Sequence, residues 1–411
     1  MQRTSAFALE HASPARLLAL AVALSMGAAI SLGITRFAYG LLLPTMRADL
    51  GWSYTLAGAM NTANAMGYLM GALVTPRLLR HHGPQTLMMW GAVLASIFMA
   101  ASGFFTGAVP LLAQRLLAGV ASSFVFIAGG LLAARLGAMQ PARTGFLLGL
   151  YYGGTGVGIT LSALLVPAVL EAAQGVPHSW AWAWWALAGG CAAATAILAW
   201  PAHSMGNAAP VHDVTQGPVR RFGWAPFGFA LAGYGMFGVG YIGYMTFVIA
   251  LLREQGAGPG SITLFYALLG VAVIASSRIW AGVLDRYQGG QALAILNGLL
   301  GVATIVPALT SVFAAVLVSG IVFGAVFLSV VASTTALVRH NLPHQGWAAG
   351  ISAFTIVFAA GQIVGPTVVG LIADAPGNFG GLGGLARGLV FSALALWVGA
   401  ALASRQRALA L

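Results

Sequence analysis

Long apolar stretches alternate with short polar stretches along almost the whole chain. A helix needs about 20 residues to cross a hydrocarbon core about 30 Å thick. The pattern therefore predicts an all-α membrane protein with twelve transmembrane helices, near residues 16–43, 55–76, 86–104, 109–134, 145–169, 180–200, 224–252, 261–284, 291–310, 313–338, 347–372 and 386–404.

One polar stretch, residues 201–222, is longer than the others and rich in Pro, Gly and small residues, which is typical of a linker. It predicts an N-terminal half (1–200), a cytoplasmic linker (201–222) and a C-terminal half (223–411). Arg47 and Arg253 are separated by the same spacing as Arg80 and Arg286, which indicates an internal repeat. Two parallel six-helix halves of this kind imply a ligand site between them and alternating access.

Composition supports this interpretation, since 59% of the 411 residues are hydrophobic and only 6% are charged. A soluble domain carries roughly 25% charged residues. The first apolar run is too long for the core of a signal peptide, so we expect it to remain as the first helix. The expected location is the cytoplasmic (inner) membrane of a bacterium, with the lipid bilayer as a partner.

The net charge of +11 reflects the orientation of the chain in the membrane. The chain has no lysine, and successive loops alternate between many and few arginines. With a cytoplasmic N-terminus, the inner loops and tails hold Arg3, Arg16, Arg77, Arg80, Arg135, Arg143, Arg220, Arg221, Arg286, Arg339, Arg405 and Arg407. The outer loops hold only Arg47, Arg253 and Arg387. This asymmetry predicts that both termini are cytoplasmic, and it gives no reason to expect a nucleic-acid partner.

The charged side chains inside the predicted helices are all arginines. All seven acids and all eight histidines fall in tails, in loops or at helix ends, which disfavours the usual proton carriers. Arg36, Arg115 and Arg278 lie within predicted helices, each roughly two turns from an end. Their planar guanidiniums suit a carboxylate or a phosphate, which indicates an anionic ligand.

A structural alternative remains open for each of these arginines. An arginine two turns from an interface can extend its head group to the lipid phosphates or bond to backbone carbonyls. It can also pair with an acid near a helix end, such as Asp49, Asp285 or Asp374.

The loop Gly282-Val-Leu-Asp285-Arg286-Tyr-Gln-Gly289 resembles the Gly-x-x-x-Asp-Arg-x-x-Gly motif of the major facilitator superfamily, although it is one residue shorter before the aspartate. The resemblance implies a gating role for Gly282, Asp285, Arg286 and Gly289. The equivalent first-half loop, residues 71–83, has no acid.

Other stretches resemble the same superfamily. They include the sequence Arg115-Leu-Leu-Ala-Gly119, which implies a structural or gating alternative for Arg115, and the glycine-rich stretches 149–158 and 361–370. Close helix packing is the alternative to a dedicated antiport element for those glycines. The first-helix sequence Gly33-Ile-Thr-Arg36-Phe37-Ala-Tyr39-Gly is similar to the YbfB/YjiJ-type group.

The resemblance implies a monomeric transporter whose cavity is lined by polar residues of several helices. Arg278 resembles the arginine with which carboxylate-carrying facilitators hold their substrate. The candidate substrate-binding residues are Arg36, Tyr39, Asn61, Asn64, Arg115, Tyr152, Tyr241, Arg278 and Gln362. Each of the uncharged ones can instead bond to a neighbouring helix. The tryptophans Trp180, Trp182, Trp184 and Trp185 are expected in the aromatic belt at the membrane interface.

No enzyme motif, cofactor site or cluster of metal ligands is evident, and Cys191 is the only cysteine. The expected function is transport of a small molecule, with a small organic anion preferred. Efflux of drugs or of other neutral or cationic metabolites is the alternative. A non-transporting membrane receptor on the same scaffold is a second alternative.

Overall fold

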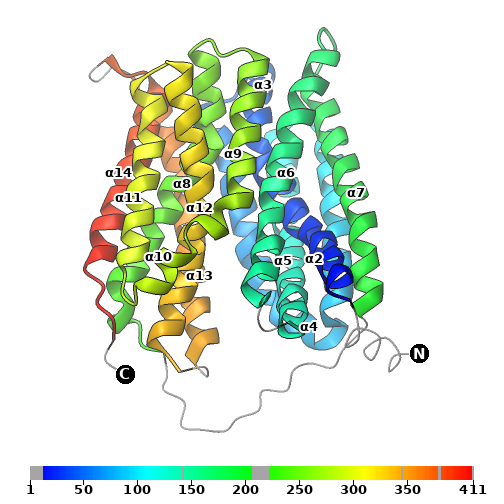
Figure 1. Cartoon of the computed structure of the whole chain (residues 1–411). Helices are drawn as coiled ribbons and strands as arrows, with labels where there is room; N and C mark the ends of the chain where they lie inside the picture. The colour runs from blue at the N-terminus through cyan, green and yellow to red at the C-terminus, as the bar shows by residue number, and fades with distance from the viewer. Residues whose placement is uncertain (1–12, 141–142, 206–221, 344–345, 378–380, 410–411) are drawn as a thin grey trace. The chain divides into compact units, whose positions relative to one another are not determined.

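The computed structural model describes residues 13–140, 143–205, 222–343, 346–377 and 381–409 (Figure 1). These residues form helices and no strand, so the all-α prediction is confirmed. The elements of the first part are α2 (Pro14–Ala28), the π-helix η1 (Ala29–Phe37), α3 (Tyr39–Leu50), α4 (Tyr54–Ser102), α5 (Ala108–Ala138), α6 (Thr144–Ala172) and α7 (Ser179–Met205). The second part holds η3 (Ala225–Phe227), α8 (Gly228–Glu254), α9 (Pro259–Ile279), α10 (Ala281–Arg286), α11 (Gln291–Leu309), α12 (Phe313–Asn341), α13 (Trp347–Asp374) and α14 (Gly384–Ser404).

Eleven helical stretches of the described residues are long and apolar enough to cross a membrane. One of them, the 49-residue α4, contains two of the predicted spans. Its backbone leaves the helical conformation at Gly83, where φ is 76° and ψ is 163°. Such a positive φ strains any residue with a side chain, and Pro84 cannot donate a backbone hydrogen bond, so the helix is interrupted here. The twelve predicted spans are therefore present.

Several spans run a few residues past their predicted bounds, and two of the differences bear on the candidate site. The first span continues to Leu50 rather than ending at residue 43, because Pro44 is accommodated inside the helix. A proline is tolerated in a membrane helix where neighbouring groups satisfy the freed carbonyl. The predicted eighth span, 261–284, breaks at Trp280 into α9 and the short α10. The predicted linker begins inside α7, which ends at Met205, and its residues 206–221 lie outside the described residues.

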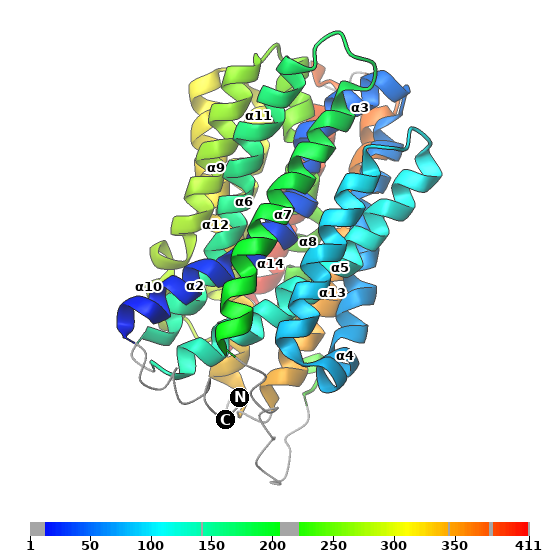
Figure 2. The same cartoon turned by 90° about the vertical axis from the view of Figure 1, so that its right-hand side faces the viewer.

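The helices form two compact units. The first consists of Met1–Leu50 and Ala63–His212, and the second of Gly51–Thr62 and Asp213–Leu411. In the first unit, the path from α2 through η1 contacts α5, α6 and α7, and Figure 2 shows it in dark blue among them. In the second unit, α8 contacts α11, α13 and α14, and α9 contacts α12 (Figure 1).

Glycines set the close approach of helices in both units. A Cβ atom on Gly33 of η1 would lie 2.6 Å from the Cα atom of Gly158 on α6. In the second unit, a Cβ atom on Gly365 of α13 would lie 2.5 Å from the carbonyl oxygen of Val239 on α8. The two glycine-rich stretches therefore serve close packing between backbones, as small residues do in membrane helices.

The first turns of α4 pack within the second unit. The Asp374 carboxylate accepts hydrogen bonds from the backbone N–H of Tyr54 (2.9 Å), the backbone N–H of Thr55 (2.7 Å) and the Thr55 hydroxyl (2.7 Å). A carboxylate satisfies the free N–H groups of a helix start and complements the helix dipole. Asp374 thus fixes where α4 begins against the end of α13.

Candidate functional site

Two arginines are buried inside the first unit. Arg36 lies in η1 and Arg115 lies in α5, and each is only 2% exposed. The two guanidiniums are close enough for their like charges to interact. Because the first helix continues to Leu50, Arg36 lies about four turns from that helix end instead of the predicted two. Because the Arg36 side chain is only 2% exposed, its extension to the lipid head groups is a poor account of its position.

Arg115 is oriented by a carbonyl and two aromatic rings. Its Nη1 donates a hydrogen bond to the carbonyl oxygen of Thr35, 2.7 Å away. Its Cζ atom lies 5.0 Å from the centre of the Tyr39 ring and 5.7 Å from that of Trp184. Thr35 belongs to the π-helical η1, and such segments change the usual backbone pairing and are frequent at functional sites. A cation beside aromatic faces is stabilised by about 0.5–2 kcal/mol per ring.

Arg36 also lies beside an aromatic ring. Its Cζ atom lies 5.8 Å from the centre of the Tyr68 ring, and the Asn64 side-chain amide donates a hydrogen bond to the carbonyl oxygen of Arg115. We call the residues Arg36, Tyr39, Asn64, Tyr68, Arg115 and Trp184 the arginine cluster. The cluster joins four of the predicted site residues, namely Arg36, Tyr39, Asn64 and Arg115.

Sequence reasoning missed Tyr68 and Trp184. The assignment of Trp184 and Trp180 to the aromatic belt is wrong, because both are 1% exposed. Trp180 donates its indole N–H to the Asp49 carboxylate, whose Oδ2 atom also lies 2.6 Å from Nδ1 of His178. Spacing distinguishes Trp180 and Trp184 from Trp182, since residues four apart share one face of a helix. Trp182 is half exposed and points away from that face.

The second unit holds three other candidates. The Gln362 amide of α13 donates a hydrogen bond to the Tyr241 hydroxyl of α8, and both side chains are buried. The Asn61 amide donates to the Thr246 hydroxyl at 2.8 Å. Tyr241 also belongs to a group of aromatic rings whose neighbouring centres are 4.7–5.8 Å apart, all stacked except Phe354, which meets Tyr234 edge-on. We call this set the aromatic stack, and its members are Tyr234, Phe237, Tyr241, Phe354 and Phe358.

The remaining candidates lie at exposed positions. Arg278 is exposed in the last turn of α9, since the helix breaks at Trp280. Tyr152 is 40% exposed and packs beside Phe126 and Tyr151.

The predicted gating motif occupies α10 and the turn after it. Gly282, Asp285 and Arg286 are exposed, and the Arg286 Cζ atom lies 5.8 Å from the centre of the Tyr287 ring. Gly289 is buried, and a Cβ atom there would lie 2.8 Å from the carbonyl oxygen of Gln406. Among the described residues, no group of three or more His, Cys, Asp or Glu side chains could hold a metal ion.

Known structures share this fold across nearly the whole chain. A bacterial homologue of the human lysosomal transporter Spinster, in an inward-facing and unoccupied conformation, matches with a TM-score of 0.67 at 15% identity and covers 95% of this chain and 96% of its own. The nucleoside transporter NupG matches with a TM-score of 0.66 at 13% identity over 95% of this chain and 98% of its own. A bacterial homologue of the human drug peptide transporters PepT1 and PepT2 gives 0.67 at 14% identity over 96% of both chains.

These identities are low, so the likeness shows the fold alone. None of the curated proteins matches this sequence. One family covers most of the chain, residues 28–404, under the description "Uncharacterised MFS-type transporter YbfB". Its members are transporters rather than enzymes. This match and the eleven apolar stretches of the described residues show that the chain belongs to the YbfB-type family of the major facilitator superfamily, and that it is a multi-pass membrane protein of a transporter family.

Proposed function

We propose that this chain is a secondary transporter that moves a small organic anion by alternating access, and that Arg36 and Arg115 hold the anion. The observation that carries the proposal is the burial of two neighbouring guanidiniums in one cluster. Like charges in a dry interior repel each other, and the desolvation of each charge costs several kcal/mol. A carboxylate that receives hydrogen bonds from both guanidiniums offsets both costs.

The neighbours of the two arginines suit the same ligand. The Tyr39 hydroxyl can donate a hydrogen bond, and the rings of Tyr68 and Trp184 give an apolar wall for the carbon skeleton of an organic acid. Arg278 is proposed as a further anion contact from its place in the sequence. The residues Gly282, Asp285, Arg286 and Gly289 are proposed as the gating loop.

Coupling does not need a carboxylate of the protein. The sequence has only seven acids, and none lies in the middle of a predicted span. An anion that carries its own proton, or that exchanges for another anion, satisfies the charge balance. We also propose that the protein lies in a bacterial inner membrane with both termini in the cytoplasm. Its halves, 1–200 and 223–411, are joined by the linker 201–222. It works as a monomer and has no nucleic-acid partner.

A panel of ligands tests the substrate class. The purified protein is melted in detergent with small carboxylates, phosphates, sugars or lipophilic cations, since a ligand of the folded state raises the melting temperature by mass action. We expect millimolar carboxylates to raise it by a few degrees. The shift should be lost in Arg36→Gln and Arg115→Gln and kept in Arg253→Gln, which changes an exposed arginine at the end of α8.

Transport of the best ligand into proteoliposomes then separates a transporter from a receptor. Binding without counterflow would favour the non-transporting alternative. Equal shifts in wild type and in both cluster variants would refute the anion assignment. Arg278→Gln is measured beside them, because its exposed position makes it a separate test of that contact.

The aromatic stack favours a second candidate, the efflux of neutral or cationic compounds. Aromatic rings are a suitable lining for an aromatic or cationic ligand, which gains about 0.5–2 kcal/mol per contact, and these rings would have to open to admit it, since most of them are buried. In that case lipophilic cations stabilise the wild type, Phe237→Ala removes the shift, and the arginine variants respond as the wild type does.

A further inference from the structure

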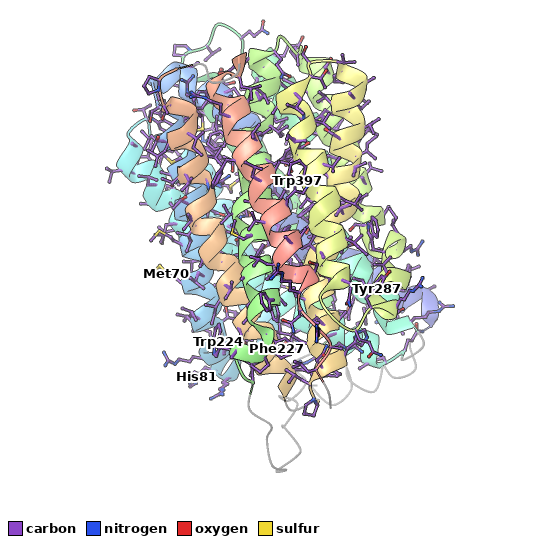
Figure 3. All side chains as sticks on the ribbon, turned by 90° about the vertical axis from the view of Figure 1, so that its left-hand side faces the viewer. Met70, His81, Trp224, Phe227, Tyr287 and Trp397 are labelled. Atoms are coloured by element: carbon purple, nitrogen blue, oxygen red, sulfur yellow. The ribbon has the colours of Figure 1, made fainter. Side chains whose placement is uncertain are left out.

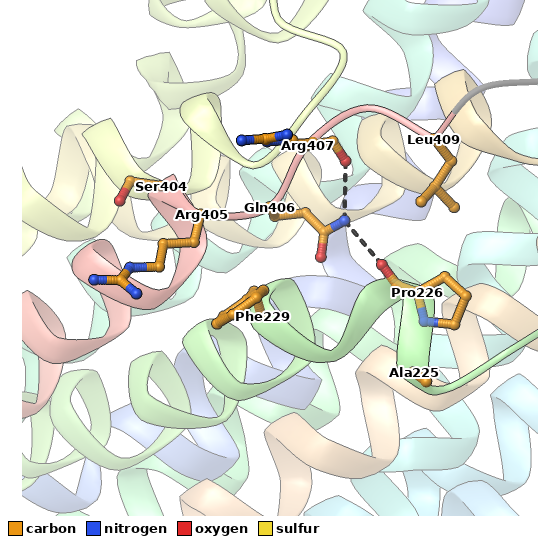
Figure 4. A pocket seen from close by; sticks show the side chains of 8 residues that line it. All are labelled: Ala225, Pro226, Phe229, Ser404, Arg405, Gln406, Arg407 and Leu409. Carbon is orange, nitrogen blue, oxygen red and sulfur yellow. Dashed lines mark hydrogen bonds between the residues drawn. The ribbon is translucent and has the colours of Figure 1, made fainter.

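A pocket outside the proposed transport site lies where α8 begins and the chain leaves α14. It has a volume of about 610 Å³, and its walls include Pro226, Phe229, Ser404, Arg405, Arg407 and Leu409 (Figure 4). No acidic residue is among the described residues that line it. The anionic-ligand proposal for the arginine cluster does not involve this pocket.

Gln406 fixes the wall of the pocket. Its side-chain amide donates to the carbonyl oxygens of Pro226 and Arg407, both at 3.0 Å, and its side-chain oxygen accepts from the backbone N–H of Ala230. Its own carbonyl oxygen accepts from the backbone N–H of Gly290. Figure 4 draws the first two of these bonds as dashed lines. The tail is therefore held in one conformation against the starts of α8 and α11.

The tail presents two positive charges beside this anchored residue. Gln406 is buried, whereas Arg405 and Arg407 on either side of it are exposed, and Figure 4 shows all three among the residues that line the pocket. Two guanidiniums on the lining of one pocket suit a phosphate group, which accepts several charge-assisted hydrogen bonds.

The surroundings of the charges are apolar. Phe229 is 47% exposed and Trp224 is 54% exposed, and Figure 3 shows Trp224 beside Phe227 at the end where α8 begins. Two apolar spans, Ala225–Glu254 and Gly384–Ser404, end at the pocket, so it lies at the level of a membrane interface. A preference for arginine on one side of a membrane explains the charges but not an anchored pocket with an apolar rim.

We propose that this pocket binds the phosphate of an anionic phospholipid, with Arg405 and Arg407 holding the phosphate and Phe229 contacting the first part of an acyl chain. Basic pockets between membrane helices bind such head groups. A free phosphate ion has the same charge chemistry but lacks the chain, so it makes only part of these contacts.

Titration of the full-length protein with lipids tests the proposal. Phosphatidylglycerol, phosphatidylcholine or inorganic phosphate is added to the delipidated protein in detergent, and bound lipid is counted by native mass spectrometry beside thermal unfolding. We expect phosphatidylglycerol to bind at least about tenfold more tightly than phosphatidylcholine. The double variant R405Q/R407Q should lose that preference, and R253Q, at the opposite end of α8, should keep it.

Two further variants keep the test decisive. R405K/R407K retains both charges and should retain most of the preference, whereas F229A should weaken phosphatidylglycerol binding without changing inorganic phosphate binding. These substitutions leave the backbone partners of Gln406 in place. Equal binding of both lipids, or an unchanged preference in R405Q/R407Q, would overturn the proposal. Stabilisation by inorganic phosphate at the same concentration as by the lipid would also overturn it, since it would indicate a soluble anion.

Discussion

Arg115 donates a hydrogen bond to the carbonyl oxygen of Thr35, the residue that precedes Arg36 in the chain. This bond ties α5 to η1 and so sets the position of one guanidinium relative to the other. The donor of this bond, the Arg115 guanidinium, also lies against the rings of Tyr39 and Trp184. Arginine meets these requirements with its planar, delocalised head group, whereas lysine offers a compact ammonium.

Arg115→Lys is therefore expected to reduce transport strongly while the positive charge is kept. We expect at least about a tenfold loss of ligand affinity, because one tenfold step corresponds to about 1.4 kcal/mol and a lost charge-assisted hydrogen bond contributes about that much. The ligand-induced shift in melting temperature measures the effect. Full activity of Arg115→Lys would mean that charge alone suffices at this position.

Gly33→Ala should destabilise the first unit. The added Cβ atom would lie 2.6 Å from the Cα atom of Gly158 and 2.7 Å from the carbonyl oxygen of Thr155, and neither backbone atom can move alone. Overpacking of this kind costs about 1–3 kcal/mol. The melting temperature of the purified protein reports it.

Gly189→Ala is the matched control for this substitution. Gly189 lies within α7, and a Cβ atom there meets nothing within 4 Å. Alanine also favours a helix over glycine by about 1 kcal/mol, so this variant should be as stable as the wild type or more so. A similar melting temperature for both alanine variants would contradict the close approach of η1 and α6.

Asp374→Ala should loosen the start of α4, because three hydrogen bonds from Tyr54 and Thr55 end on that carboxylate. Loss of a capping side chain costs about 0.5–2 kcal/mol. Hydrogen exchange of the Tyr54 and Thr55 amides should become faster, and the melting temperature should fall. Asp285→Ala removes an exposed acid from α10 and should leave both quantities unchanged. Unaltered exchange in Asp374→Ala would show that packing alone fixes the helix start.

Gln362 and Tyr241 should be energetically coupled. Their hydrogen bond joins α13 to α8 inside a buried and mostly aromatic surrounding. A double-mutant cycle with Gln362→Ala and Tyr241→Phe should give a coupling energy of about 0.5–1.5 kcal/mol in the free energy of unfolding. Additive effects of the two substitutions would mean that the bond contributes nothing in solution.

The sequence predicts the fold well because the length of an apolar run is a direct consequence of bilayer thickness. The break at Gly83 lies within the predicted loop between residues 76 and 86, which separates two spans in α4. The π-helical η1 and the break at Trp280 could not be predicted in this way. Both depend on contacts with other helices, and hydropathy reports only whether a segment is apolar.

The candidate site is predictable only in part. Arg36 and Arg115 stand out in the sequence as charges in apolar runs, but their proximity depends on how η1 and α5 are rotated about their axes. The inward direction of Trp184 follows from its spacing to Trp180 once one of them is known to be buried. Arg278 is equally conspicuous in the sequence, yet the structure leaves it exposed at a helix end. A charge in an apolar run therefore marks a candidate without indicating its neighbours.

Trp184 gives the arginine cluster an optical reporter of its own. Its ring centre lies 5.7 Å from the Cζ atom of Arg115, so the indole experiences the electric field of that cation. An anion bound there would cancel much of the field, since the interaction of charges at such distances is large in a dry interior. The emission of Trp184 should then shift in wavelength, and a variant that keeps only this tryptophan would report binding by fluorescence, without a label or a transport assay.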